Sequence, residues 1–155
     1  MRLINESINN YCTPILIMNK WDLLNEDEKL RINSTLNSHL KKFNWIKVIR
    51  ISALTKKGLD KFSKTINEIY LQLDLRIDTS DLNLFFRELW VSSPPHPFRG
   101  RRAKLKYVTQ YDTNPPSFSF NLSSRIPKNY EAFIENKIRK EFKFSNVSML
   151  LKFKN

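Results

Sequence analysis

The 155-residue sequence has only two glycines, Gly58 and Gly100, and a single cysteine, Cys12. A phosphate loop of the type G-x-x-x-x-G-K-[ST] needs two closely spaced glycines, so the sequence does not contain one. It also has no D-x-x-G segment to position Mg²⁺ and an attacking water. Phosphoryl transfer depends on phosphate positioning and metal charge, so we expect no hydrolysis of a nucleoside triphosphate by this chain alone.

One cysteine cannot form an intrachain disulfide, which is typical of a protein from a reducing compartment. No apolar stretch reaches the length of about 18 residues that a membrane helix needs. The first residues also lack the charged and apolar regions of a secretory signal. We therefore expect a cytoplasmic protein that does not enter a membrane.

Positive charge is abundant and unevenly distributed along the chain. The formal net charge is +12, and hydrophobic residues make up 41%, enough for a packed core. Residues 1–93 contain 14 Lys and Arg against 11 Asp and Glu, a net charge of +3, whereas residues 94–155 contain 13 against 4, a net charge of +9. The second half is therefore the part expected to face a polyanion.

Near the start of the chain, four apolar residues, Ile15 to Met18, run directly into Asn19-Lys20-Trp21-Asp22. An apolar run of this length predicts a strand buried on both faces of a parallel sheet. Ligands of such sheets bind where the strands end at their carboxyl side, and the polar tetrapeptide would emerge there.

The residue types of this tetrapeptide suit guanine. The Asp22 carboxylate accepts hydrogen bonds from the ring N–H and the exocyclic amino group, a pair of donors that adenine lacks. The Asn19 amide can tie neighbouring loops together or meet the base edge, and the apolar stem of Lys20 can lie over the ring. The alternative is a polar turn after a strand, since N-K-x-D would occur by chance in about one such sequence in ten.

The rest of the first half alternates helix and strand. Asn25 and Glu28 predict a capping box at the start of a helix that runs to about Leu40, with Leu30, Leu36 and Leu40 facing inward. A second buried strand, 46–51, ends in Ser52-Ala53. An apolar stripe at helical spacing then predicts a helix whose side chains pack in a core: Leu59, Phe62, Ile66, Ile69, Tyr70 and Leu73. This order predicts the closing half of a doubly wound parallel sheet.

The second half has a different pattern. A helix from about Asp78 is followed by alternation of period two, in which Ala103, Leu105 and Tyr107 share one face. A second strand around Phe118 is expected to pair with the first, a helix over 129–143 follows, and Val147, Met149, Leu151 and Phe153 predict a last strand. On the helix, Lys137, Arg139 and Lys140 alternate with glutamates, which indicates a solvated surface. The fold class is therefore α/β in residues 1–76, followed by an α+β module (α-β-β-α-β) in residues 77–155.

Three further segments carry a family resemblance: Gly100-Arg101-Arg102-x-Lys104-x-Lys106-Tyr107-x-x-Gln110, Asn114-Pro115-Pro116-x-Phe118, and Tyr130-x-x-Phe133-x-Glu135-Asn136-x-x-Arg139-x-x-Phe142. They resemble the KH-like C-terminal domain of the Der (EngA) family, bacterial GTPases with two tandem G domains and a KH-like domain. Residues 1 to about 75 resemble the end of the second G domain.

The resemblance implies GTP or GDP as ligand, Mg²⁺ only in a complete G domain, and a role in assembly of the large ribosomal subunit. It implies that Asn19, Lys20 and Asp22 recognise guanine, with Ser52 and Ala53 closing the base pocket. The implied partners are ribosomal RNA and the upstream G domains in cis. Whether the chain is an enzyme stays open.

The chain departs from an RNA-gripping KH domain because it has no GXXG loop. This absence disfavours an Era-type GTPase. A basic run remains as a candidate phosphate-contacting edge, with a solvated strand face as the alternative: Arg99, Arg101, Arg102, Lys104 and Lys106. The competing function is an RNA- or ribosome-binding adaptor that does not use nucleotide and in which the G-domain part is only scaffold.

Overall fold

The computed structural model describes residues 1–155, which divide into two compact units. The first unit contains Met1–Gln72 together with Asn146–Ser148. The second contains Leu73–Ser145 together with Met149–Asn155. None of the helices combines the length and the apolar character that a membrane crossing requires.

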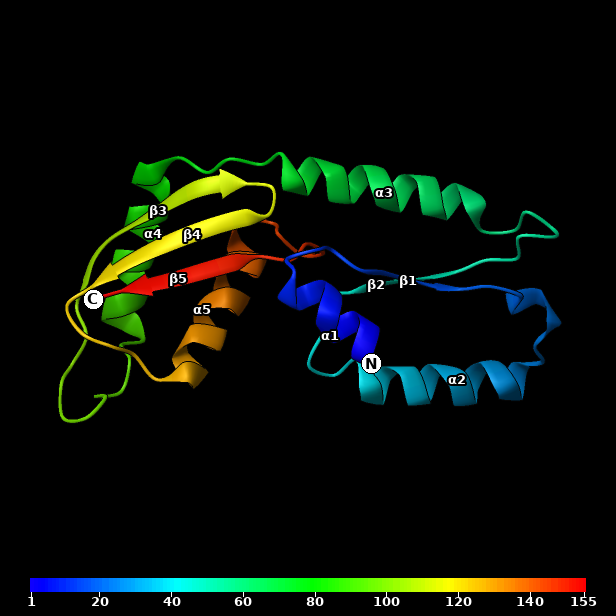
Figure 1. The fold of residues 1–155 in the computed structure, drawn as a ribbon, viewed down its shortest axis with the longest axis horizontal. Coiled ribbons are helices and arrows are strands. Elements are labelled where there is room, and N and C mark those ends of the chain that lie inside the picture. The colour runs from blue at the N-terminus through cyan, green and yellow to red at the C-terminus, as the bar shows by residue number, and fades with distance from the viewer. The chain divides into compact units, whose positions relative to one another are not determined.

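The first unit alternates helices and strands, as the sequence predicts (Figure 1). Strands β1 and β2 pair in parallel, with Ile15 opposite Lys47 and Met18 opposite Arg50. The elements in chain order are α1 (Arg2–Asn9), β1 (Ile15–Met18), the 3-10 helix η1 (Trp21–Leu23), α2 (Glu26–His39), β2 (Lys47–Arg50) and α3 (Leu59–Leu73).

The predicted capping box at the start of α2 is confirmed. The Glu28 backbone N–H donates to Asn25 Oδ1 at 2.9 Å, and the Asn25 N–H donates to Glu28 Oε2 at 2.9 Å. Each bond satisfies a backbone donor near the helix start that has no partner within the helix. Such a box depends on residues three positions apart, which is why the sequence alone predicts it.

The core of the first unit is small. Leu40, Trp45 and Ile46 are buried, and half-buried side chains from α1, α2 and β1 pack against them. Two expectations about this unit are wrong: Leu30 is 67% exposed, and Ile17, at the centre of β1, is 42% exposed. Only Ile17 of β1 is exposed and the other three residues are half-buried, so the strand is not buried on both faces.

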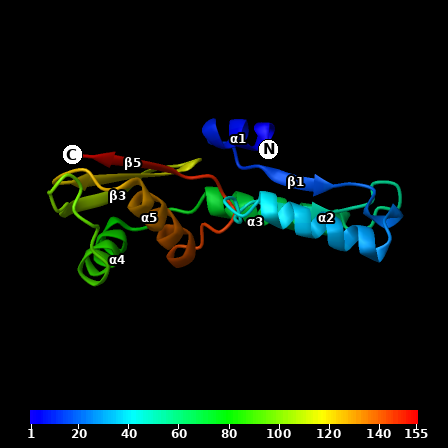
Figure 2. The same ribbon diagram turned by 90° about the horizontal axis from the view of Figure 1, so that it is seen from below.

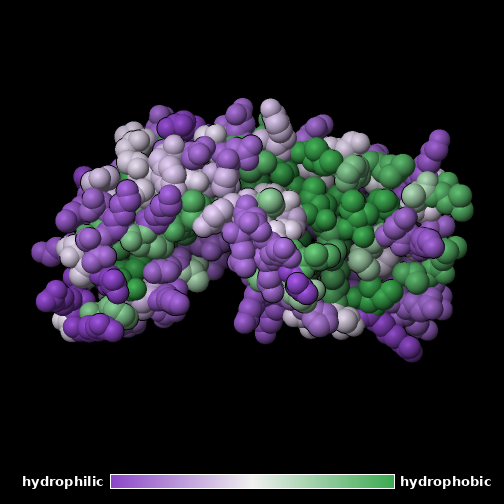
Figure 3. All heavy atoms as spheres, in the orientation of Figure 1, coloured by the Kyte–Doolittle hydropathy of each residue, from purple (hydrophilic) through white to green (hydrophobic).

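The apolar stripe of α3 is also only partly buried. Ile69 lies in the core, but Leu59, Ile66 and Tyr70 are exposed, so the prediction of a fully packed stripe is wrong for these three residues. Figure 3 shows apolar residues gathered at the surface over α3 and the β1–β2 sheet. A contiguous apolar surface of this kind indicates a face that packs against another part of a protein.

The second unit has the predicted order helix, strand, strand, helix, strand. Strand β4 is central, antiparallel to β3 and parallel to β5. Figures 1 and 2 show both helices of this unit on one face of its sheet. The elements are α4 (Thr79–Ser92), β3 (Leu105–Thr113), β4 (Pro116–Leu122), α5 (Lys128–Glu141) and β5 (Leu150–Lys154).

Aromatic side chains dominate the core of the second unit. Phe86 of α4 meets Phe120 of β4 edge to face, with ring centroids 4.9 Å apart, and Phe118 meets Phe144 at 5.8 Å. All four rings are fully buried. Burying a large apolar side chain stabilises a fold by roughly 1.5–3 kcal/mol, so the core of this unit is expected to be more stabilising than the small core of the first unit.

The predicted alternation along β3 is wrong beyond Leu105. The register of β3 against β4 shifts between Leu105 and Tyr107. Such a bulge adds one residue to a strand and reverses which side chains face inward. As a result Tyr107 is 50% exposed, while Val108 and Gln110 are buried.

Two further expectations about the second half are corrected. Strand β5 begins at Leu150, and Val147 is buried in the first unit instead of extending the strand. Arg139 does not lie on a solvated helix face: it is only 9% exposed. Its guanidinium donates to Glu135 Oε1 at 2.7 Å and to the Phe144 carbonyl at 3.1 Å, and these bonds compensate for its burial.

The difference between the two cores predicts the order of proteolysis. Trypsin is expected to cut first within residues 1–75 and to leave a resistant C-terminal piece, because cleavage requires local opening. The density of trypsin cleavage sites does not favour this outcome, since residues 94–155 contain 13 Lys and Arg. Mass spectrometry of a digestion time course measures it, and equal resistance of both halves would contradict it.

Candidate functional site

The candidate site lies where β1 and β2 end. Asn19 follows β1, Ser52 and Ala53 follow β2, and the parallel pairing places both ends at the same edge of the sheet. Asn19 Oδ1 accepts a hydrogen bond from the Lys20 N–H at 2.8 Å and another from the Ala53 N–H at 3.1 Å. The Asn19 amide thus ties the two loops together, which is one of the two roles that the sequence suggested for it.

The backbone holds the tetrapeptide in a tight turn. Lys20 has a left-handed conformation with φ of 60°, and the next residues form η1. The Trp21 N–H donates to the Ile51 carbonyl at 3.1 Å, and the Ile51 N–H donates to the Met18 carbonyl at 2.9 Å. Asp22 is exposed, so its carboxylate is free to accept hydrogen bonds from a ligand.

The loop after β2 is fixed by its own contacts. Ser52 is 2% exposed, its N–H donates to the Lys57 carbonyl at 2.9 Å, and its Oγ accepts from the Thr55 N–H at 3.2 Å. Gly58 closes this loop with φ of 84°, and a Cβ there would lie 2.5 Å from the Arg50 carbonyl oxygen. Only glycine satisfies both the conformation and the close approach.

Sequence reasoning missed Arg50, the last residue of β2. Its guanidinium lies 5.2 Å from the centroid of the Trp21 ring, and its Nε and Nη2 both donate to Asn33 Oδ1 of α2. One side chain thus joins β2, α2 and the tetrapeptide. A cation over an indole face is stabilising, and the only signal for it in the sequence is an arginine at the end of an apolar run.

The basic run of the second unit is exposed throughout. Arg99 and Arg101 line a cavity of about 410 Å³ together with Arg125, which sequence reasoning did not include. Arg102, Lys104 and Lys106 do not line that cavity. The structure therefore divides the basic run in two. Arg99 and Arg101 line the cavity, and the other three cations lie on exposed surface outside it.

Two side chains of the second unit have shifted pKa values. Burial raises the pKa of Tyr130 to about 12, and its hydroxyl donates to the Ser93 carbonyl at 2.6 Å. Burial also lowers the pKa of Arg139, and the charge and hydrogen bond of Glu135 act in the opposite direction. Both groups have structural partners, and neither lies at the candidate site where β1 and β2 end.

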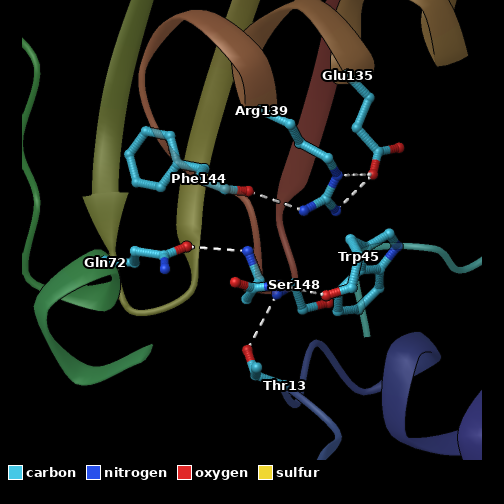
Figure 4. A network of polar contacts seen from close by, with 8 residues as sticks. Thr13, Trp45, Gln72, Glu135, Arg139, Phe144 and Ser148 are labelled. Carbon is cyan, nitrogen blue, oxygen red and sulfur yellow. Dashed lines mark hydrogen bonds and ion pairs between the residues drawn. The ribbon is translucent and has the colours of Figure 1, made fainter. Parts of the chain in front are cut away.

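Figure 4 shows two sets of polar contacts. In the second unit, Arg139 bridges Glu135 and the Phe144 carbonyl. In the first unit, the segment Asn146–Ser148 is held by three bonds: from the Asn146 N–H to Gln72 Oε1 at 2.9 Å, from Asn146 Nδ2 to the Trp45 carbonyl at 2.9 Å, and from the Ser148 N–H to Thr13 Oγ1 at 3.0 Å.

In comparisons with known proteins, a family profile matches the second part of the chain, and longer relatives match nearly all of it. The family profile described as "KH-domain-like of EngA bacterial GTPase enzymes, C-terminal" matches residues 76–154. GTPase Der of Chlorobium limicola is 35% identical to this chain over 157 residues, which cover 99% of the chain and 36% of that protein. GTPase Der of Chlorobaculum tepidum is 32% identical over 157 residues, which again cover 99% of the chain and 36% of that protein.

The chain thus spans about a third of the length of the curated relatives it matches. Its KH-like residues match a profile specific to one family, and the similarity to the Der relatives extends over nearly the whole chain. The chain belongs to the Der (EngA) family of bacterial GTPases, of which it represents the C-terminal part.

Proposed function

We propose that this chain is the C-terminal part of a GTP-binding protein that acts in assembly of the large ribosomal subunit. In this proposal residues 1–76 are the closing half of a G domain, built on a doubly wound parallel sheet, and residues 77–155 are the KH-like domain. The observation that carries it is the hydrogen bond of 3.1 Å from the Ala53 N–H to Asn19 Oδ1, which joins the two loops expected around the base.

The donors and acceptors at this site fit a guanine base. The exposed Asp22 carboxylate is acceptor-only and matches guanine's two adjacent donors, whereas adenine presents no such pair. We assign the Lys20 stem to the face of the ring. Ala53 already donates its N–H to Asn19, so we assign Ala53 and the buried Ser52 to shaping the pocket wall.

The phosphate end of a nucleotide has no counterpart in this chain. With glycines only at 58 and 100, there is no phosphate loop to surround the phosphates with backbone N–H groups. In the proposal, upstream G domains in cis supply that loop and the residues that hold Mg²⁺. GTP or GDP then binds across both parts, with this chain providing the base-specific end.

The isolated chain is therefore expected to bind guanine nucleotides weakly and not to hydrolyse GTP. Titration followed by ¹H–¹⁵N correlation spectra tests this, with GDP as ligand and ADP as control. Shifts are expected at the Ala53 amide and the Asn19 side chain with GDP only, at millimolar concentrations. Binding at micromolar concentration with stimulated turnover would contradict the expectation.

The competing function is an RNA- or ribosome-binding adaptor whose G-domain part is only scaffold. The apolar surface over α3 and the β1–β2 sheet suits either function, because a scaffold also packs against neighbours. The same titration separates the two. If neither nucleotide shifts the Ala53 amide at any concentration, the base site is not functional and the adaptor is favoured.

In both functions the KH-like domain contacts ribosomal RNA of the large subunit. Support comes from the net charge of +9 in residues 94–155 and from the exposure of Arg99, Arg101, Arg102, Lys104 and Lys106. The phosphate backbone dominates the affinity of most proteins for nucleic acids. Without a GXXG loop, this domain must bind RNA through a different feature.

A further inference from the structure

A cavity in the second unit gathers three arginines from two loops. It has a volume of about 410 Å³, and its lining includes Phe98, Arg99, Arg101, Ser123 and Arg125. We call these five residues the arginine cleft. Its volume falls within the range of about 300–1,000 Å³ that is common for small-ligand sites.

The first wall of the cleft is a tight hairpin turn. Phe98 and Arg101 exchange two backbone hydrogen bonds, of 3.0 and 3.1 Å. The two residues between them have positive φ, 50° for Arg99 and 76° for Gly100. This conformation at both central positions is typical of a two-residue hairpin loop, so the turn holds Arg99 and Arg101 at defined positions before any ligand binds.

The second wall is the loop after β4, and it is also fixed by hydrogen bonds. The Ser123 N–H donates to the Lys104 carbonyl at 2.9 Å, and the Lys104 N–H donates to Ser123 Oγ at 2.8 Å. Arg125 follows two residues later. Two walls fixed in this way lower the entropic cost of ordering a binding site.

The three arginines of the cleft are not neutralised by an acidic side chain. Arg99, Arg101 and Arg125 are exposed, and none of them forms an ion pair within the chain. Arg125 also borders a neighbouring cavity of about 210 Å³ whose lining includes Glu131, and Asn155 lines both cavities. Three unpaired guanidinium groups around one hollow favour an anion with several oxygens, because each can donate two parallel hydrogen bonds.

An aromatic ring beside the arginines distinguishes RNA from a simple anion. The Arg99 guanidinium lies 5.7 Å from the centroid of the Phe98 ring, and Phe98 is half-buried in the same lining. Proteins that bind single-stranded RNA combine cations for the backbone with aromatic or guanidinium planes for the bases. An acidic peptide would use the cations but not the ring.

We propose that the arginine cleft binds a phosphodiester of single-stranded RNA, with the adjacent base against Phe98. This proposal rests on the RNA contact in the proposed function and adds the residues that make it. Arg125 and Arg101 hold the phosphate from opposite walls, and Arg99 lies beside the base. The cleft thus takes the place of the absent GXXG loop as the backbone-binding feature.

Fluorescence anisotropy with a labelled decauridylate tests the proposal on the full 155-residue chain. Arg101→Gln and Arg125→Gln are each expected to weaken binding about tenfold and to lower the slope of log affinity against log salt by about 0.7. Arg31→Gln removes one exposed arginine from α2 in the first unit and serves as the matched control. It is expected to stay within about twofold of the parent chain.

The outcomes separate this proposal from the proposed function. If the parent chain binds RNA and the cleft variants bind it with the same affinity as Arg31→Gln, RNA contacts other residues and the cleft proposal is wrong. If the parent chain does not bind RNA even at low salt, both are wrong. If hexaglutamate displaces the labelled decauridylate as well as unlabelled RNA does, the cleft is a protein-binding surface and the RNA assignment is wrong. Unchanged midpoints of thermal unfolding would show that the variants fold.

Discussion

Asp22→Asn is expected to shift the nucleotide preference from guanine toward xanthine by about tenfold or more. The asparagine amide presents one acceptor and one donor where the carboxylate presents acceptors only. Its donor would face guanine's amino group, whereas xanthine has a carbonyl at that position. A mispaired buried polar group costs about 1–3 kcal/mol, which corresponds to the expected change in preference.

The measurement is competition between GTP and xanthosine triphosphate at equal Mg²⁺, in a chain extended at its N-terminus by a G-domain front with a phosphate loop. Asp74→Asn is a matched control, because Asp74 is exposed and lies outside the site. An unchanged ratio in the Asp22 variant would mean that this carboxylate does not contact the base. The assignment of Asn19-Lys20-Trp21-Asp22 would then be wrong.

Arg139→Ala is expected to lower the free energy of unfolding of the second unit by about 2–4 kcal/mol. The guanidinium is 9% exposed and bridges Glu135 and the Phe144 carbonyl. Its removal leaves a buried carbonyl without this donor and opens a cavity beneath α5. Because Phe144 packs against Phe118, disorder at this point extends to the aromatic core.

Urea unfolding followed by tryptophan fluorescence measures this effect. Lys140→Ala removes an exposed cation from the next position of the same helix and is expected to change stability by no more than about 0.5 kcal/mol. Arg139→Met fills much of the volume of the arginine side chain but makes none of its hydrogen bonds. Its loss of unfolding free energy is expected to lie between those of Arg139→Ala and Lys140→Ala. If Arg139→Ala behaves like Lys140→Ala, the buried bridge does not stabilise the unit.

The features that the sequence predicted correctly depend on neighbours in the chain. The Asn25 and Glu28 capping box spans one helical turn, and the period of apolar residues sets the order of helices and strands. The pairing of β3 with β4 follows from two adjacent strands joined by a short turn. Local chemistry determines these features, so no knowledge of the rest of the fold is needed.

The errors arise where burial depends on distant parts. The periodicity of α3 correctly indicates an apolar face, but a two-stranded sheet covers only part of it, so Ile66 and Tyr70 stay exposed. The bulge before Tyr107 is a property of the pairing with β4 and leaves no mark on the alternation of the sequence. Arg139 resembles its exposed neighbours in composition, and only the tertiary fold provides the Phe144 carbonyl as its partner.

For the candidate site where β1 and β2 end, the sequence names the residues proposed to contact a base but not the residues that hold them in position. The tetrapeptide and Ser52-Ala53 are each recognisable by type and spacing. Arg50 and Asn33 are not, because an arginine–asparagine pair separated by 17 positions has no sequence signature. Residues that position a site are chosen by geometry, whereas residues that contact the ligand are chosen by chemistry.

The segment Asn146–Ser148 has a consequence for folding during synthesis. Its bonds to Gln72, Trp45 and Thr13 complete the first unit with residues that are translated 74, 101 and 135 positions after these partners. Domains often fold in order as they leave the ribosome, but this unit cannot reach its final state until Asn146–Ser148 have been made, after the residues of the second unit that precede them. Until then the first unit lacks these three hydrogen bonds, and Val147, which is fully buried in the finished fold, is not yet in place.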